Sequence, residues 1–286
     1  MATRTPYPYA VLDVFTERPL EGNQLAVVRD ADGLEDDVMA AFARETRLSE
    51  TTFVQSASAG GADYRNRIFT VAREIPFAGH PSLGTAVAVA AARGEREAAY
   101  VQETGAGLQP IDVRLDGESG YASMLQEPAT FGDELDARHA LAAVGLVLGD
   151  AHREFPPQVV STGLETLIAP VASVTCVKQA QPDPELIEAL AKRSGFSNFY
   201  LVCLQEGGRA RARMFTSQVA GGEDPATGSA AGPLCAYLAE RGWGDRVEIT
   251  QGIEIGRPST LYAVMENGRP RVGGGVVRVI EGDVFL

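Results

Sequence analysis

A weak internal repeat limits this chain to folds built from two similar halves. The matched segments, in chain order, are 48–50 with 196–198, 61–70 with 207–216, 80–86 with 224–230, and 101–104 with 247–250. Each match alone is weak, but four matches in one order at nearly one offset indicate a duplicated unit. Such a repeat has to be recognised before single elements are assigned, because it decides the architecture.

Hydrophobic periodicity predicts the same order of elements in both halves. In the first half we expect strands at 9–15, 24–28, 52–55, 64–69, 100–102 and 111–115, and helices at 36–47 and after His80. In the second half we expect strands at 166–170, 200–204, 211–215 and 246–250, and helices at 184–194 and 226–241. Each half is then an α+β domain, 1–127 and 128–286, of ordinary domain size. The last strand, 276–286, can cross back to the first domain or pair with another chain.

Two helical segments are apolar on every side. Residues 83–92 and 226–238 lack a polar face, which is the pattern of a helix buried in a core. We therefore expect a strongly curved, barrel-like sheet around a central helix in each domain. Small residues on these helices would let the strands approach closely: Gly84, Ala86, Gly228, Ala230 and Gly232.

A polar residue followed by proline precedes both apolar segments, as His80-Pro81 and as Asp224-Pro225. Proline suits the first helical position, because its missing N–H would have no partner there. The open N–H groups at such a helix end attract anions. If the halves pack as related mates, the two ends face each other and suit a small carboxylic acid. Asp224 has a second interpretation as a simple N-cap, and His80 as a hydrogen-bonded core residue.

Glu50 lies between the first amphipathic helix and the next strand, and its repeat mate is Asn198. A carboxylate thus stands in one half only, as expected if a single half holds a base. The alternative interpretation is a solvated glutamate at a helix–strand junction.

The charge pattern argues against two classes of partner. The formal net charge of −13 is spread along the chain, and Lys178 and Lys192 are its only lysines. Nucleic acids and anionic membrane surfaces are bound by clustered Lys and Arg, so we expect neither.

The cysteines and the apolar runs predict a cytoplasmic protein. Cys176, Cys203 and Cys235 are an odd, scattered set, which fits a reducing compartment better than a disulfide framework. The N-terminus has no apolar run that could serve as a signal peptide. The longest apolar stretch, 86–92, is far shorter than the ~20 residues that span a bilayer.

No metal or nucleotide site is expected. The three histidines, His80, His139 and His152, are far apart in sequence, and with the scattered cysteines they form no ligand cluster. The Gly273–Gly275 run is expected to be a turn between strands, since no helix follows it as in a phosphate-binding loop. The dinucleotide fingerprint is absent around Gly79 and Gly228.

Five segments spread nearly end to end carry a family resemblance: PLEGN at 19–23, LSETTFV at 48–54, PFAGHP at 76–81, EDPATGSAAGP at 223–233 and QGIEIGRP at 251–258. In these segments the sequence resembles the phenazine-biosynthesis isomerase (PhzF-like) family, which shares its fold with diaminopimelate epimerase. The Gly-His-Pro segment followed by Glu-Asp-x-x-Thr-Gly-Ser is specific to the family.

The resemblance implies two similar domains with a diaminopimelate epimerase-like fold, and a cofactor-independent isomerase. Its substrate would be trans-2,3-dihydro-3-hydroxyanthranilate, which loses a proton at C3 and gains one at C1. By resemblance, Glu50 is the proton shuttle, His80 and Asp224 support the transfer, and Gly79, Gly228 and Ser229 bind the substrate. Burial would raise the pKa of such a shuttle, whereas a charged His80 or the helix dipoles would lower it. Homodimers are common in the family, so a homodimer is expected.

Two other functions stay open from the residues. The related epimerase uses one cysteine from each domain, but no cysteine here heads a buried helix, so two-thiol chemistry is not expected. A racemase or isomerase of another small carboxylic acid would use the same fold with a different pocket. A non-catalytic binding protein for aromatic acids would use the helix ends without a base.

Overall fold

The computed structural model describes residues 5–117, 119–216 and 222–286. Its contacts divide the chain into two compact units. Unit 1 comprises Met1–Met124 and Gly273–Leu286, and unit 2 comprises Leu125–Val272.

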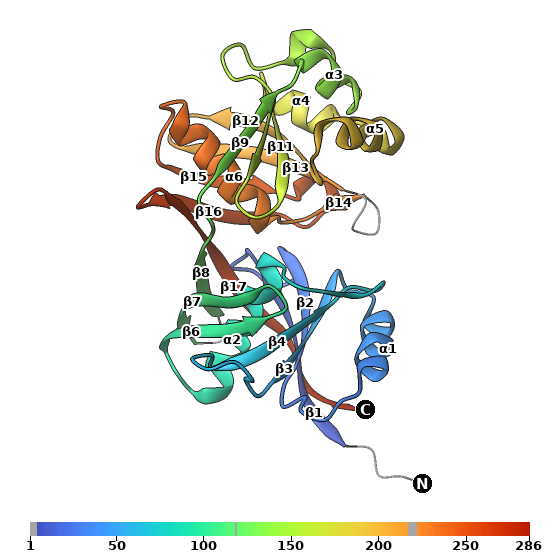
Figure 1. The fold of residues 1–286 in the computed structure, drawn as a ribbon, viewed down its shortest axis with the longest axis vertical. Helices are drawn as coiled ribbons and strands as arrows, with labels where there is room; N and C mark the ends of the chain where they lie inside the picture. Colours follow the sequence, from blue (N-terminus) through green and yellow to red (C-terminus); the bar gives the residue numbers. More distant parts are fainter. Residues whose placement is uncertain (1–4, 118, 217–221) are drawn as a thin grey trace. The chain divides into compact units, whose positions relative to one another are not determined.

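Unit 1 is a closed barrel with a helix inside it (Figure 1). Its strands are β1 (Pro6–Val14), β2 (Asn23–Val28), β3 (Glu50–Gln55), β4 (Tyr64–Phe69), β5 (Glu74–Ile75), β6 (Glu97–Thr104), β7 (Gly107–Asp116), β8 (Ser119–Leu125) and the end of β17 (Arg269–Phe285). Pairing runs in the order β1, β2, β3, β4, β6, β7, β8 and β17, and β17 pairs back to β1. The short β5 extends from β4. The ring of pairings leaves no open edge among these eight strands.

The helix α2 (Gly79–Arg93) fills this barrel. Residues 80–90 are all buried, and α2 packs against β1, β2, β3, β4, β6 and β7. The predicted buried helix is therefore confirmed, and it begins at Gly79, ahead of the predicted start at Pro81. It ends at Gly94, whose left-handed backbone (φ 70°) closes the last turn.

The helix α1 (Asp36–Thr46) covers the outer face of the barrel at β3 and β4 (Figure 1). It is amphipathic, and its apolar face packs Met39 and Ala43 onto Phe53 and Phe69. The two phenylalanine rings meet edge to face with centroids 5.4 Å apart. The pattern of polar and apolar residues at 36–47 thus predicts both the helix and the face that it buries.

Unit 2 repeats the order of strands in unit 1 and the directions in which they pair. Its strands are β9 (Thr130–Glu134), β10 (Gln158–Ser161), β11 (Glu165–Val171), β12 (Asn198–Gln205), β13 (Arg209–Phe215), β14 (Glu223–Asp224), β15 (Arg246–Gln251), β16 (Ser259–Glu266) and the start of β17. From β10 to β16 the steps are antiparallel, parallel, antiparallel, parallel and antiparallel, as they are from β1 to β7. The short β14 extends from β13 as β5 does from β4. The sequence repeat is therefore a repeat of structure.

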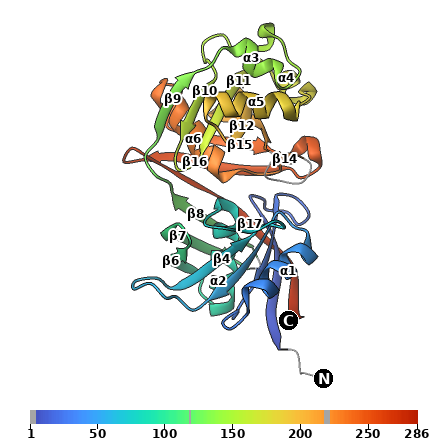
Figure 2. The ribbon, with the colours of Figure 1, turned by 45° about the vertical axis from the view of Figure 1, so that its right-hand side comes forward.

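A second buried helix, α6 (Gly228–Glu240), lies against β10, β11, β15 and β16. These strands come from opposite ends of the sheet, so the sheet curves around the helix. The helices α3 (Ala137–Ala142), α4 (Val174–Gln179) and α5 (Pro184–Ser194) cover the outside and complete an apolar cluster with β11 and β12 (Figure 2). Short 3₁₀ turns lie at Leu148–Asp150 and Ile253–Ile255.

The prediction of a turn at Gly273–Gly275 is wrong. These glycines lie inside β17, where Gly273 and Gly274 are buried and Gly275 is half-buried. A side chain at Gly275 would put its Cβ 2.5 Å from the Thr16 carbonyl oxygen, and the Gly275 carbonyl accepts hydrogen bonds from the Phe15 and Thr16 N–H groups. Glycine is required here by close backbone approach within a strand, which local sequence cannot distinguish from a turn.

Candidate active site

Glu50 is the first residue of β3, at the point where β3 pairs in parallel with β2. Its side chain is 12% exposed, so the alternative of a solvated glutamate is wrong. A hydrogen bond between the Thr46 and Thr51 hydroxyl groups (2.9 Å) ties the end of α1 to the start of β3. The short α1–β3 connection therefore holds the Glu50 carboxylate inside unit 1.

His80 is the second residue of α2, and its Nε2 lies 3.2 Å from Glu50 Oε2. Burial lowers the pKa of His80 to about 3, while a backbone hydrogen bond with Gln24 acts in the opposite direction. His80 is therefore neutral near pH 7. The Asn23 Nδ2 lies 3.4 Å from His80 Nδ1. If this amide donates to Nδ1, the imidazole proton is on Nε2, the ring nitrogen nearest Glu50, although the 3.2 Å contact lacks hydrogen-bond geometry.

Two buried threonines fix the helix that carries His80 to the strand that carries Glu50. The Thr52 and Thr85 hydroxyl groups are 2.8 Å apart, and Thr52 also donates to the Ala26 carbonyl oxygen on β2. Both threonines are fully buried. The contact joins β3 to α2, so the spacing between Glu50 and His80 is set by packed elements rather than by a loop.

Asp224 lies in unit 2, on β14, and is buried. The Thr227 hydroxyl donates to Asp224 Oδ2. The Gln251 side-chain nitrogen donates to the Asp224 carbonyl (2.8 Å) and to the Thr227 hydroxyl (3.0 Å). Gln251 in turn accepts from the Tyr200 hydroxyl (3.0 Å). Burial, and then the charge of Asp224, raise the pKa of Tyr200, which therefore remains a donor.

The three predicted substrate-binding residues lie at the two helix ends. Gly79 is the first residue of α2, and the buried Gly228 and half-buried Ser229 begin α6. The Gly228 carbonyl accepts from the Gln126 side chain (2.9 Å), and Gln126 also accepts from the Thr162 hydroxyl (2.7 Å). The first turn of α6 is thus held from the side by Gln126.

The predicted helix starts are wrong in detail. Pro81 is the third residue of α2, and Pro225 lies ahead of α6, so neither proline is at the first helical position. Asp224 is not an N-cap, because the N-cap of α6 is Thr227. The Thr227 hydroxyl bonds to Asp224 and its N–H to Gln251, and such side-chain bonds compete with helical ones. They delay the start of α6 by about one turn relative to α2.

Sequence reasoning missed two residues of these networks. Asn23 and Gln251 are fully buried polar side chains in contact with His80 and with the Asp224–Thr227 segment. Both occur in the segments at 19–23 and 251–258, and each stands at an end of a strand. A buried amide at a strand end beside a predicted site residue is the signal that could have found them.

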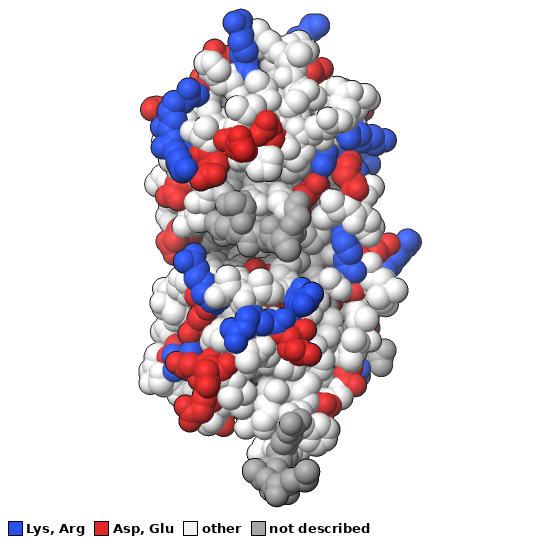
Figure 3. Space-filling model, turned by 90° about the vertical axis from the view of Figure 1, so that its right-hand side faces the viewer, with Lys and Arg blue, Asp and Glu red and all other residues white. Residues whose placement is uncertain are grey.

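Residues 5–117, 119–216 and 222–286 contain no group of three His, Cys, Asp or Glu side chains placed to hold a metal ion. The three cysteines are buried, and burial raises the pKa values of Cys203 and Cys235. Within the same residues, no helix has the length and apolar character needed to cross a bilayer. Figure 3 shows acidic and basic groups interspersed on both units, with no extended basic area on that face.

A family model described as phenazine biosynthesis-like protein matches residues 12–282. The trans-2,3-dihydro-3-hydroxyanthranilate isomerase of Pseudomonas aeruginosa is 39% identical over 269 residues, which cover 92% of each chain. This chain belongs to the phenazine biosynthesis-like (PhzC–PhzF) family. Another family relative, an uncharacterized isomerase of Mesorhizobium japonicum, is 35% identical over 299 residues, covering 97% of this chain and 98% of the relative.

Solved structures agree with this family membership. A structure described as a predicted epimerase from Pseudomonas aeruginosa has a TM-score of 0.85 and 37% identity, and covers 98% of this chain and 99% of its own. A hydroxyproline epimerase from Agrobacterium vitis has a TM-score of 0.63 at 14% identity, covering 99% and 92%. The second likeness shows the fold alone. This chain therefore has a mixed α+β fold that resembles the proline racemase and epimerase structures.

Proposed function

We propose that this protein is a cofactor-independent isomerase that moves a proton on trans-2,3-dihydro-3-hydroxyanthranilate, in phenazine biosynthesis. The observation that carries the proposal is the buried contact of 3.2 Å between Glu50 and His80. The names of relatives at 35–39% identity support the choice of substrate. The finer fold assignment, to the diaminopimelate epimerase-like class, belongs to the same proposal.

In the proposed reaction Glu50 acts as both base and acid. Its carboxylate takes the proton from C3, and the same group delivers a proton to C1, so the substrate is isomerised with no net gain or loss of atoms. The resulting enol then tautomerises to the amino-ketone. A buried carboxylate with a fixed neighbour suits this task, because proton transfer at carbon needs a positioned group shielded from water.

His80 and Asp224 support this transfer in different ways. A neutral His80 packs its Nε2 edge 3.2 Å from Glu50 Oε2 and so limits the orientations open to the carboxylate. We propose that Asp224 acts on the same substrate and that Gly79, Gly228 and Ser229 bind its carboxylate. The N–H groups at a helix start suit a carboxylate because they are donors at the positive end of the helix dipole.

Turnover by the purified protein tests the proposal. The protein is mixed with trans-2,3-dihydro-3-hydroxyanthranilate, and the loss of substrate absorbance is followed for the wild type and for Glu50→Gln. We expect turnover by the wild type and almost none by the variant. No turnover by either protein, or equal turnover by both, would refute the assignment.

If the dihydro acid is not a substrate, two alternatives are separated by isotope exchange. Deuterium uptake from D₂O at a Cα position, across a panel of small amino acids, would indicate a racemase or isomerase of another acid. Binding of aromatic acids without exchange would indicate a binding protein. The predicted homodimer is tested separately, by the molar mass in solution.

A further inference from the structure

The two units carry the same arrangement of arginine, phenylalanine and glutamate beside the short strand that precedes each buried helix. In unit 2, Arg213 on β13 binds Glu223 on β14 through two parallel bonds, Nε to Oε1 (2.9 Å) and Nη2 to Oε2 (2.7 Å). The guanidinium lies 4.9 Å from the centroid of the Phe215 ring. Phe215 is also the residue with which Glu223 pairs across the β13–β14 ladder.

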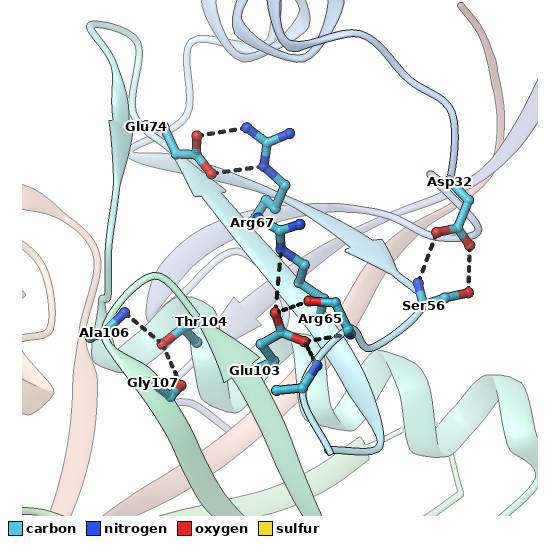
Figure 4. Close-up of polar contacts among 11 residues, drawn as sticks. Asp32, Ser56, Arg65, Arg67, Glu74, Glu103, Thr104, Ala106 and Gly107 are labelled. Carbon is cyan, nitrogen blue, oxygen red and sulfur yellow. Dashed lines mark hydrogen bonds and ion pairs between the residues drawn. The ribbon is translucent and has the colours of Figure 1, made fainter. Parts of the chain in front are cut away.

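In unit 1, Arg67 on β4 binds Glu74 on β5 in the same two-bond geometry, at 2.8 and 2.7 Å (Figure 4). Arg67 lies over the Phe69 ring at 5.3 Å, and Phe69 pairs with Glu74. The repeat aligns Arg67 with Arg213 and Phe69 with Phe215. The arrangement is therefore a feature of the duplicated unit and is not confined to one half.

The two pairs differ in burial and in the other partners of the arginine. The side chains of Arg213 and Glu223 are each 9% exposed, whereas Glu74 is 41% exposed. Arg213 also donates through Nη1 to the carbonyl groups of Val177 and Ala180, at 3.1 and 2.8 Å, which anchors it to α4 and the residue after it. Arg67 instead donates its third hydrogen bond, from Nη1, to the carboxylate of Asp36, which is mostly exposed.

The buried pair is next to Asp224 in the chain. Glu223 and Asp224 are the only residues of β14, and Asp224 pairs with Met214 as Glu223 does with Phe215. A bidentate arginine–carboxylate pair fixes the position and the plane of the carboxylate that it holds. Fixing Glu223 against β13 therefore fixes the backbone from which the Asp224 carboxylate projects. Glu74, by contrast, is six residues ahead of His80.

We infer that Arg213 and Glu223 are positioning residues for Asp224, and that the equivalent Arg67–Glu74 pair has no such role for His80. The inference rests on the proposed function only in taking Asp224 as a residue that meets the substrate. It does not assign Arg213 or Glu223 to contact with the substrate. Small displacements of a positioned group can reduce the rate by up to about 100-fold.

Matched variants in the two units test the inference. We expect Glu223→Gln to lower kcat on the dihydro acid about 10- to 100-fold with KM changed by less than about threefold, and Glu74→Gln to leave both within about twofold. A single change could unfold the protein by leaving Arg213 buried and uncompensated. The double variant Arg213→Met/Glu223→Leu removes both charges and should fold, because apolar residues often replace a buried ion pair without loss of stability. We expect it to show the same loss of kcat.

Hydrogen exchange separates this inference from the proposed function. Amides in residues 222–232 should exchange at least about tenfold faster in Glu223→Gln than in the wild type, with no change there in Glu74→Gln. This readout needs no substrate. Unchanged exchange, or a folded double variant with wild-type kcat, would overturn the positioning role. Absence of wild-type turnover combined with the expected exchange would refute the function and leave the structural positioning intact.

Discussion

Unit 1 and unit 2 hold different side chains at matching positions of one framework. Glu50 begins β3 and pairs with Leu25 on the parallel strand β2. Asn198 begins β12 and pairs in the same way with Thr166 on β11. Both side chains are largely buried. One position is an ionisable carboxylate and the other is a neutral amide. Duplication has therefore kept the strand pairings and changed the group that could carry a proton.

The starts of the two buried helices also carry different side chains in different surroundings. His80 lies within the first turn of α2, beside Glu50, whereas its repeat mate Asp224 lies ahead of α6 in a separate network with Thr227 and Gln251. Each unit therefore holds a different kind of polar group at its helix start. Unit 1 presents a buried carboxylate–imidazole pair, and unit 2 presents a fixed aspartate next to the start of α6.

The largest expected effect comes from making unit 1 resemble unit 2. In Glu50→Asn we expect kcat on the dihydro acid to fall about 10²- to 10⁴-fold, the range contributed by a positioned acid–base group. The protein should still fold, because unit 2 accommodates asparagine at the equivalent position. Steady-state kinetics and thermal unfolding check both expectations. The exposed Glu45→Gln is the control, and retention of more than a tenth of wild-type kcat in Glu50→Asn would contradict the proposed role.

Asp224 tests whether unit 2 contributes chemistry or only structure. We expect Asp224→Asn and Asp224→Ala each to lower kcat about 100-fold, as for loss of a supporting group in proton transfer. Asparagine can still accept the Thr227 hydroxyl, so its free energy of unfolding should stay near that of the wild type. If Asp224 only supports Thr227, the free energy of unfolding of the alanine variant should fall by on the order of 1 kcal/mol. Its activity per folded molecule should then stay at the wild-type level.

Close packing around α2 depends on Gly84, whose repeat mate Gly228 begins α6. A Cβ at Gly84 would lie 2.6 Å from Leu25 Cδ2 and 2.9 Å from Val14 Cγ2. We expect Gly84→Ala to lower the free energy of unfolding by about 1–3 kcal/mol through overpacking. Gly60, which has open space around it, is the control, and Gly60→Ala should not destabilise. Urea unfolding gives both values, and equal effects would show that close packing at α2 is unimportant.

The smallest predicted effect concerns pH and comes from His80 in unit 1. Because burial lowers the pKa of His80 from 6.5 to about 3, the unfolded chain binds a proton between these pH values that the folded chain does not. The contribution of this group to the free energy of unfolding is constant well above pH 6.5 and falls as the pH falls through 6.5, by about 1 kcal/mol between pH 6.5 and 5.5. Urea unfolding of the wild type and His80→Gln over this interval isolates the effect. Greater stabilisation of the wild type on acidification would instead indicate a charged His80–Glu50 pair.

Local sequence patterns predicted much of the scaffold. The strand at 64–69 and the helix at 184–194 have the predicted bounds, and both all-apolar segments are buried helices. These features depend on periodicity and on residue type within a short window. The predicted strand at 52–55 began too late, because the strand includes Glu50, whose charge hid it.

Elements that depend on distant partners were missed. The glycines at 273–275 belong to β17 because β1 and β8, far away in sequence, supply its hydrogen bonds. The two-residue strands β5 and β14 are too short to show a pattern and are formed by pairing with β4 and β13. The strands β8, β9, β10 and β16 and the helices α3 and α4 were also not predicted. For the strands, tertiary pairing rather than local propensity creates the element.

The candidate site was predictable in part. From the residues alone, His80 and Asp224 drew attention because they precede apolar segments, whereas Glu50 gained its role from the family resemblance. The sequence could not show that Glu50 and His80 are in contact, nor that Asn23 and Gln251 hold the two networks. These contacts join segments that are about 25 to 60 residues apart, and only the folded barrel and sheet bring them together. The catalytic roles themselves stay predictions.

Isotope transfer tests whether a single carboxylate in unit 1 shuttles the proton. Substrate deuterated at C3 is converted in H₂O by the wild type and by Glu50→Gln, and deuterium at C1 of the product is measured at early times. We predict that part of the C3 label appears at C1 with the wild type, and that Glu50→Gln forms no product. Turnover of Glu50→Gln at the wild-type rate, with the same label transfer, would contradict a proton shuttle at Glu50.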